Sequence, residues 1–251
     1  MSKCAIVTIC KDEPHFMKMW YEYYSQHFAD ADIYILDNGC QETQWDGIGG
    51  NIELTDHPLT IENAARGHSD TYITQPKIKK CLKLLESYEY VMNVDTDEFV
   101  VPDPDKYPGG LKQFIDGFTG VFAQCTGYNV LDNGVPFNPV SKPWLAQRDE
   151  YHCDWNHYCK VVLASENPEW GGGSHNSKWN HHDKRLKQEH MRPDLNLFHL
   201  HYMCKELLTE RYNMRGNPAF NPENAARSVD AYYNHPKFTR EMIPGKWKQA
   251  L

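Results

Sequence analysis

The sequence lacks any apolar run that could cross a membrane as a helix, which takes about 18 to 20 residues. Its start also lacks the charged and apolar segments of a secretory signal peptide. These two absences argue against a membrane-spanning or secreted protein. We therefore expect a soluble, cytoplasmic protein.

An excess of basic residues is also missing. Acidic residues outnumber basic ones by 34 to 26, which gives a net charge of −8, and no basic stripe stands out. A general nucleic-acid partner is therefore not expected. The local run 77–80, with three lysines, is interpreted as the solvated face of a helix.

The eight cysteines show no disulfide framework, because they are scattered and several fall inside apolar runs. Without a secretory signal, we expect reduced and mostly buried thiols. His152, Cys153, His157 and Cys159 offer zinc ligands, but their spacing matches no standard zinc finger. We therefore do not favour a zinc site there.

The first hundred residues alternate between strand and helix patterns. Continuous apolar runs at Cys4–Cys10 and 33–36 predict buried strands, with a weaker candidate at Asn51–Leu54. Helical periodicity follows at 15–24 and at 78–85. This order is typical of parallel strands covered by crossover helices. The length of 251 residues suits one compact domain, and no internal repeat or linker divides it.

The later part of the chain is less regular. We expect strands at 120–130, 160–164 and 197–203 and a helix at 222–233. Residues 167–194 are rich in Gly, Trp, His and Asn and show no period, which is typical of a functional loop.

An apolar strand at 90–94 ends in a dense acidic block. Asp95 and Asp97 are two residues apart, so both side chains share a face if the chain stays extended, and Glu98 then points to the other face. Two carboxylates at a strand end suit Mg²⁺ or Mn²⁺ with a phosphate as a further ligand. A polar strand end or a helix cap is the alternative.

Asp37 follows another predicted strand and precedes Asn38 and Gly39. This composition is typical of a turn. Ligands of open α/β sheets also bind beyond the carboxyl ends of strands, where Asp37 can accept hydrogen bonds from a base or a ribose. Both interpretations stay open.

Several blocks together resemble the GT-A glycosyltransferases of the family-2-like group, in the compact branch with a D-x-D-E-F signature. The strongest are TICKDEP at 8–14, IYILDNG at 33–39 and NVDTDEFVVP at 93–102. The blocks at 199–206, similar to H-Y-x-x-K-S/E, and at 160–175, similar to K-x-I … G-x-H, are more suggestive than specific. The resemblance covers roughly residues 3–210.

The resemblance implies a single α/β domain of GT-A fold over 1–251, with a central, mostly parallel sheet flanked by helices. Residues 1–102 would form the nucleotide-sugar-binding half and 103–210 the acceptor half. A helical tail at 211–251 would follow. The implied activity is metal-dependent transfer of a sugar from a nucleotide-diphosphate donor, such as a UDP- or GDP-sugar, to a glycan or other hydroxyl acceptor.

The resemblance also implies roles for individual residues at the donor. Thr8 and Lys11 would lie near the nucleotide, Asp37 at its base, and Arg66 at a phosphate or the base. Asp95 would be divided between the metal and the ribose.

The implied metal is Mn²⁺ or Mg²⁺, held by Asp95 and Asp97 and assisted by a histidine. His199 and His201 alternate and so face the same side, and we favour His201, with His175 next. Bridging diphosphate oxygens, such an ion would stabilise the departing nucleoside diphosphate, which gives Asp97 its catalytic role.

An inverting transferase needs a carboxylate base near the acceptor hydroxyl, whereas a retaining one does not. Asp154 is our first candidate, with Asp132 and Asp149 open and an ordinary loop role as the alternative for each. Four tryptophans can serve as sugar platforms or as packing residues, namely Trp144, Trp155, Trp170 and Trp179.

Two other functions are compatible with the acidic block. A metal-dependent phosphohydrolase or nucleotidyltransferase also uses paired carboxylates, but a second acidic cluster for a second ion is not evident. A catalytically idle nucleotide-sugar-binding protein is the other. The sugar, the nucleotide, the acceptor and the oligomeric state stay open.

Overall fold

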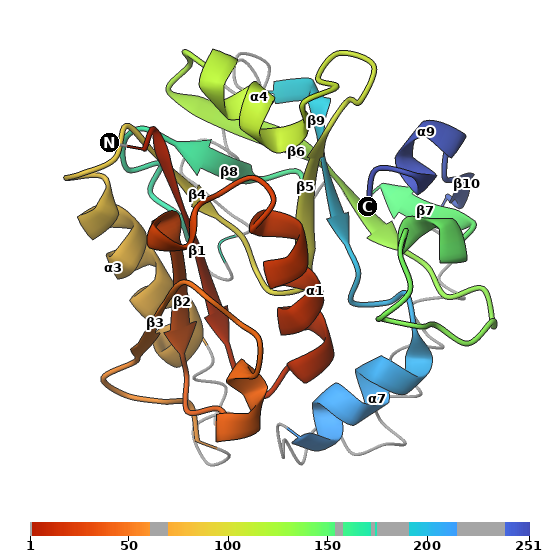
Figure 1. Ribbon diagram of the computed structural model, residues 1–251, viewed down its shortest axis with the longest axis horizontal. Coiled ribbons are helices and arrows are strands. Elements are labelled where there is room, and N and C mark those ends of the chain that lie inside the picture. The colour runs from red at the N-terminus through yellow and green to blue at the C-terminus, as the bar shows by residue number, and fades with distance from the viewer. Residues whose placement is uncertain (1, 61–69, 154–157, 172–173, 175–190, 215–238) are drawn as a thin grey trace.

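The computed structural model describes residues 2–60, 70–153, 158–171, 174, 191–214 and 239–251 (Figure 1). In this part of the chain ten strands form one mixed sheet, and helices lie on both of its faces. This confirms the predicted α/β fold class. Among the described residues, no helix combines the length and the apolar character that a bilayer span requires.

The first four strands to appear in the chain build a parallel unit at one side of the sheet. They are β1 (Cys4–Cys10), β2 (Ile33–Asp37), β3 (Asn51–Leu54) and β4 (Tyr90–Asn93), in the spatial order β3-β2-β1-β4. Their carboxyl ends therefore meet at one edge. The strands predicted from apolar runs in this region are confirmed.

Helices α1 (Pro14–Tyr24) and α3 (Gln75–Leu84) cover opposite faces of this unit. Alternation along β1 divides its side chains between them: Ile6 packs in the cluster that contains α1, and Ala5 and Val7 pack with α3. Because both faces of β1 are covered, all of its residues are buried, which explains its continuous apolar run.

The remaining strands extend the sheet beyond β4. With their bounds, they are β5 (Glu98–Pro102), β6 (Phe122–Val130), β7 (Glu150–Cys153), β8 (Val161–Ala164), β9 (Met191–His199) and β10 (Glu241–Met242). The path continues β4-β8-β6-β7-β10, and β9 pairs parallel to β6 and antiparallel to β5. The antiparallel pairs bring residues from the second half of the chain beside the end of β4.

Short elements complete the described part. They are α4 (Gly110–Gly117), α7 (Lys205–Met214), α9 (Gly245–Lys248), the 3₁₀ turns η1 (Asp30–Asp32), η2 (Glu42–Trp45) and η4 (Leu145–Gln147), and the π-helical turn η3 (Asp70–Thr74). Six of the eight cysteines are buried, and Cys40 and Cys153 are partly buried, which agrees with the expectation of mostly buried thiols.

The strand expected at 197–203 was wrong in its bounds. β9 begins at Met191 and ends at His199, and a turn then leads into α7. Its first four residues mix apolar and polar side chains, and the first three are partly or fully exposed, so they gave no apolar period. Residues 191–194 therefore belong to a strand, although they were expected in the aperiodic loop. The helix expected at 222–233 lies outside the described residues.

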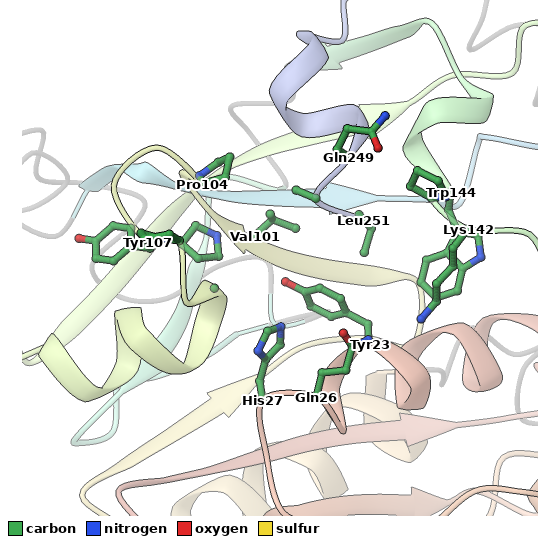
Figure 2. A pocket seen from close by; sticks show the side chains of 15 residues that line it. Tyr23, Gln26, His27, Val101, Pro104, Tyr107, Lys142, Trp144, Gln249 and Leu251 are labelled. Atoms are coloured by element: carbon green, nitrogen blue, oxygen red, sulfur yellow. The ribbon is translucent and has the colours of Figure 1, made fainter.

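A cavity of about 470 Å³ lies between α1, the turn after β5, the 142–144 segment and the last residues of the chain (Figure 2). His27 and Tyr23 lie in its wall with their rings edge to face, at a centroid distance of 5.1 Å. Burial lowers the pKa of His27 to about 4. The acidic block at 95–98 does not line this cavity.

Candidate active site

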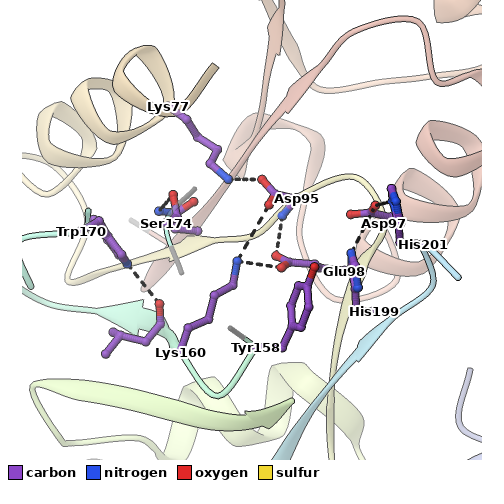
Figure 3. Close-up of polar contacts among 12 residues, drawn as sticks. Lys77, Asp95, Asp97, Glu98, Tyr158, Lys160, Trp170, Ser174, His199 and His201 are labelled. Atoms are coloured by element: carbon purple, nitrogen blue, oxygen red, sulfur yellow. Dashed lines mark hydrogen bonds and ion pairs between the residues drawn. The ribbon is translucent and has the colours of Figure 1, made fainter. Parts of the chain in front are cut away.

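Charged side chains from several parts of the chain converge just beyond the carboxyl end of β4 (Figure 3). The strand ends at Asn93, and the chain turns before β5 begins at Glu98. The Glu98 N–H donates to the Asp95 carbonyl at 3.1 Å, which closes the turn. The chain is therefore not extended through the acidic block, so the condition under which Asp95 and Asp97 would share a face is not met.

The side chain of Glu98 stabilises this turn. One of its oxygens, Oε2, accepts the backbone N–H of Asp95 at 2.8 Å, and the other, Oε1, lies 2.7 Å from Nζ of Lys160. Both side chains are fully buried. Burial raises the pKa of Glu98, although Lys160 opposes the shift. For Lys160, burial acts to lower the pKa, but Glu98 and Asp95 outweigh it and the pKa is raised. The pair stabilises the turn from within the core.

Asp95 lies on the lysine side of the turn. Nζ of Lys77 contacts Asp95 Oδ1, and Nζ of Lys160 lies 3.9 Å from Asp95 Oδ2. The Lys77 side chain is only 1% exposed, so the interpretation of 77–80 as a solvated face was wrong for this residue. Lys80 of the same helix pairs with Glu53 instead.

Asp97 points to the other side of the turn, toward two histidines (Figure 3). Its Oδ2 lies 3.4 Å from Nε2 of His199 and 3.3 Å from Nδ1 of His201. The three ligand atoms lie within 4.8 Å of one another, so the group can hold a metal ion. The pairing of β5 with β9 places Glu98 opposite His199, which brings the histidines to the acidic block. Of the predicted metal ligands, Asp97 and His201 come together here, with His199 as the third member, and Asp95 is not in this group.

The protonation states suit a ligand set. Burial alone would raise the pKa of Asp97, but Arg211 and His199 outweigh it and hold that pKa well below its usual range. Burial lowers the pKa of His201 to about 4, so its imidazole is neutral near pH 7. An ionised carboxylate and a neutral imidazole are the forms that bind metals.

Arg211 and Glu13 complete the histidine side, and neither was predicted from the sequence. The guanidinium of Arg211, on α7, donates from Nη1 to Asp97 Oδ2 at 2.5 Å and from Nη2 to Glu13 Oε1 at 2.7 Å. Glu13 Oε2 in turn accepts the hydroxyl of Thr96. No spacing in the sequence connects these residues, because Arg211 is 114 positions from Asp97.

Of the residues predicted at the donor nucleotide, Lys11 and Asp37 lie at the same edge of the sheet, and Thr8 precedes this edge within β1. Thr8 is buried in β1, and its hydroxyl has no hydrogen-bond partner among the described residues. Lys11 donates to the Gly39 carbonyl at 2.5 Å. Asp37 Oδ1 accepts the N–H groups of Gly39 and Cys40 at 2.9 and 2.8 Å, so this oxygen stabilises the turn after β2.

Several candidates lie outside the described residues, namely Arg66, Asp154, Trp155, His157, His175 and Trp179. The two alternative bases have structural partners: Asp132 accepts the Lys205 N–H at 2.9 Å, where α7 begins, and Asp149 pairs with Lys248 at 3.0 Å. Trp144 and Trp170 are buried and pack in the core, which favours the packing role for both.

No family model and no curated protein matches the chain. Among solved structures, it is similar to mannose-1-phosphate geranyltransferase from Thermus thermophilus, at 12% sequence identity and a TM-score of 0.34. The match covers 91% of this chain and 65% of that structure. A likeness this weak carries no argument about function, so the functional argument depends on the site itself.

Proposed function

We propose that this protein is a metal-dependent glycosyltransferase that moves a sugar from a nucleotide-diphosphate donor to a hydroxyl acceptor. The observation that carries the proposal is the meeting of Asp97, His199 and His201 just beyond the end of a parallel strand. Ligands of open α/β sheets bind at such strand ends. The family resemblance of the D-x-D-E-F block supports the same reaction.

In this proposal Asp97 and the two histidines hold the metal, which would neutralise charge on the departing nucleoside diphosphate. Asp95 would instead bind the nucleotide. Lys77 and Lys160 orient its carboxylate, and its side chain is 29% exposed, so it can accept a ribose hydroxyl. Asp95 and Asp97 have different roles in this proposal because the turn directs their carboxylates to opposite sides.

The remaining donor and acceptor residues are proposed from the resemblance. Thr8 and Lys11 would contact the nucleotide, Asp37 its base, and Arg66 a phosphate or the base. Asp154 would act as the base in an inverting reaction. The Thr8 hydroxyl has no hydrogen-bond partner in the described part of the chain, which supports its assignment to the nucleotide, because a buried hydroxyl without a partner costs stability unless a ligand satisfies it.

The donor set favours a transition metal. Two imidazoles and one carboxylate suit Mn²⁺ or Zn²⁺, whereas Mg²⁺ prefers oxygen ligands throughout. We therefore propose Mn²⁺ in preference to Mg²⁺. The sequence left Mn²⁺ and Mg²⁺ both open because the ligands predicted from it were mostly oxygen atoms.

The test is the release of nucleoside diphosphate from a panel of nucleotide sugars with Mn²⁺ and mixed sugar acceptors. We expect Asp97→Asn to lower turnover by about 100-fold or more, because the amide is a far weaker metal ligand. Asp116→Asn is the matched control, since Asp116 is exposed on α4 and pairs with Lys112 on the same helix. Circular dichroism would verify that both variants fold.

Three results would overturn the proposal. Full turnover by Asp97→Asn would remove the metal centre from the reaction. Formation of pyrophosphate from a nucleoside triphosphate and a sugar 1-phosphate, without transfer from any nucleotide sugar, would identify a nucleotidyltransferase instead. Nucleotide-sugar binding without turnover on any acceptor would identify an idle binding protein.

A further inference from the structure

Arg211 lies where the proposed metal ligands converge. Its Nη1 is 2.5 Å from Asp97 Oδ2 and also 2.5 Å from His201 Nδ1. An arginine N–H can only donate, so His201 Nδ1 accepts this hydrogen bond and has no proton for Asp97. The carboxylate oxygen and the imidazole nitrogen, 3.3 Å apart, are therefore two acceptors that share one cation.

We propose that Arg211 is a resident cation that a divalent metal must displace from Asp97 and His201, so that α7 responds to metal binding. This inference depends on the metal centre of the proposed function and adds its regulation. In the metal-free protein Arg211 donates hydrogen bonds to Asp97 and His201. In the metal-bound protein it no longer contacts these two residues.

The first reason is steric. Metal bonds to carboxylate oxygen and imidazole nitrogen are about 2.0 to 2.2 Å long. Asp97 Oδ2 lies 3.4 Å from the His199 nitrogen and 3.3 Å from the His201 nitrogen. These distances match the spacing between two ligand atoms of a tetrahedral metal ion with such bonds. An ion in contact with both Asp97 and His201 occupies the space that Nη1 fills, so the ion and the guanidinium exclude each other.

The second reason is charge. Asp97 and Glu13 are both buried carboxylates, and Arg211 bridges them. A divalent ion on Asp97 adds two positive charges beside the guanidinium and repels it. Glu13 remains as a partner, because it accepts both Nε at 3.1 Å and Nη2 at 2.7 Å. Arg211 can therefore release Asp97 without losing its salt bridge to Glu13.

The third reason is the position of Arg211 in the fold. It lies on α7, which follows β9 and the histidines directly in the chain. Beyond its pairing with Asp97 and Glu13, Arg211 also lies over the ring of Phe16 on α1, at 5.3 Å. A shift of its guanidinium is thereby transmitted to the contact between α7 and α1.

The experiment measures the affinity for Mn²⁺ and for Zn²⁺ alone, by calorimetry, in the wild type and in Arg211→Met. Removal of a competing cation should tighten metal binding by about 10-fold or more, since one charge-assisted hydrogen bond no longer has to be broken. Arg211→Lys should tighten metal binding less than Arg211→Met does. The lysine variant replaces the methionine variant in this experiment if the latter does not fold. Arg240→Met is the control, because Arg240 lies on the exposed surface and pairs with Glu150.

Hydrogen exchange supplies an independent measurement. In the wild type, metal addition should change the exchange of the α7 amides, and in Arg211→Met it should leave them nearly unchanged. Equal or weaker metal binding by the variants would overturn the inference and show that Arg211 supports the ligands. If neither the wild type nor the variants bind a divalent ion, the metal centre of the proposed function fails as well. Binding by the wild type without tightening in the variants refutes only the role of Arg211.

Discussion

Lys160→Met should destabilise the protein strongly, and in a way that depends on pH. Lys160 lies 2.7 Å from Glu98, and neither side chain is exposed. Methionine keeps most of the apolar stem and removes the charge. Glu98 is then a buried carboxylate without its nearest cation, while its other oxygen still accepts the Asp95 N–H.

The magnitude follows from the burial of both partners. Breaking a fully buried ion pair by removing one member costs about 3 to 5 kcal/mol of unfolding free energy. An exposed pair on a helix contributes only about 0.3 to 0.5 kcal/mol. The matched control is Lys112→Met, because Lys112 pairs with Asp116 on the surface of α4 with both side chains more than half exposed.

The pH dependence identifies Glu98 as the group that has lost its counter-ion. Burial already raises its pKa above the usual 4.5, and loss of Lys160 raises it further. Above pH 4.5 the folded variant then keeps a proton that the unfolded chain releases. Its stability therefore falls as pH rises, with a slope that approaches about 1.4 kcal/mol per pH unit until the folded pKa is passed.

Urea unfolding between pH 5 and pH 8 measures both effects. The variant should lose more stability at pH 8 than at pH 5, relative to the wild type at each pH. Adding Glu98→Gln should recover most of the loss, because the amide is uncharged and still accepts a hydrogen bond. A loss under about 1 kcal/mol that is the same at every pH would refute the role of Lys160 as the counter-ion of Glu98.

Three further predictions concern other parts of the molecule. The pKa of His27 is lowered to about 4, so the folded state binds fewer protons than the unfolded state between pH 6.5 and 4, and stability should fall by up to about 3 kcal/mol as pH drops through that window. His27→Gln should flatten this part of the pH profile, and an unchanged profile would contradict the assignment. Gly127→Ala should lower stability by about 3 kcal/mol, because the new Cβ would lie 2.2 Å from the backbone of Tyr158; an unchanged melting temperature would contradict the close approach. Mn²⁺ or Zn²⁺ should raise the melting temperature at concentrations where Mg²⁺ does not, and equal shifts from all three ions would exclude a ligand set rich in imidazole.

The sheet could be predicted from the sequence wherever burial imposes a pattern. β1 and β2 lie in the interior of the sheet, so nearly every residue is apolar and the bounds follow from the run itself. β9 shows the opposite case. Its first residues mix apolar and polar side chains and most are partly or fully exposed, so only the backbone pairing, which leaves no period in the sequence, marks them as a strand.

The candidate site could be predicted only in part. Asp97 and His201 were found from a strand end and an alternating pair of histidines, which are local signals. Arg211 and Lys77 gave no such signal, because a charged residue on a helix is exposed far more often than it is buried. Their burial depends on a partner elsewhere in the chain, and one sequence does not show which carboxylate lies opposite.

Glu98 explains why the acidic block works as two separate carboxylates and not as a pair. An extended chain would place Asp95 and Asp97 on one face, where their charges repel and a shared cation would be needed. The bond from the Asp95 N–H to Glu98 stabilises a turn instead, and the turn directs Asp95 toward Lys77 and Asp97 toward the histidines. Each carboxylate then has its own compensating partners within the protein. In the proposed function, a divalent ion at Asp97 consequently leaves the pairing of Asp95 with Lys77 in place, so metal and nucleotide would bind at neighbouring positions without competing for one oxygen.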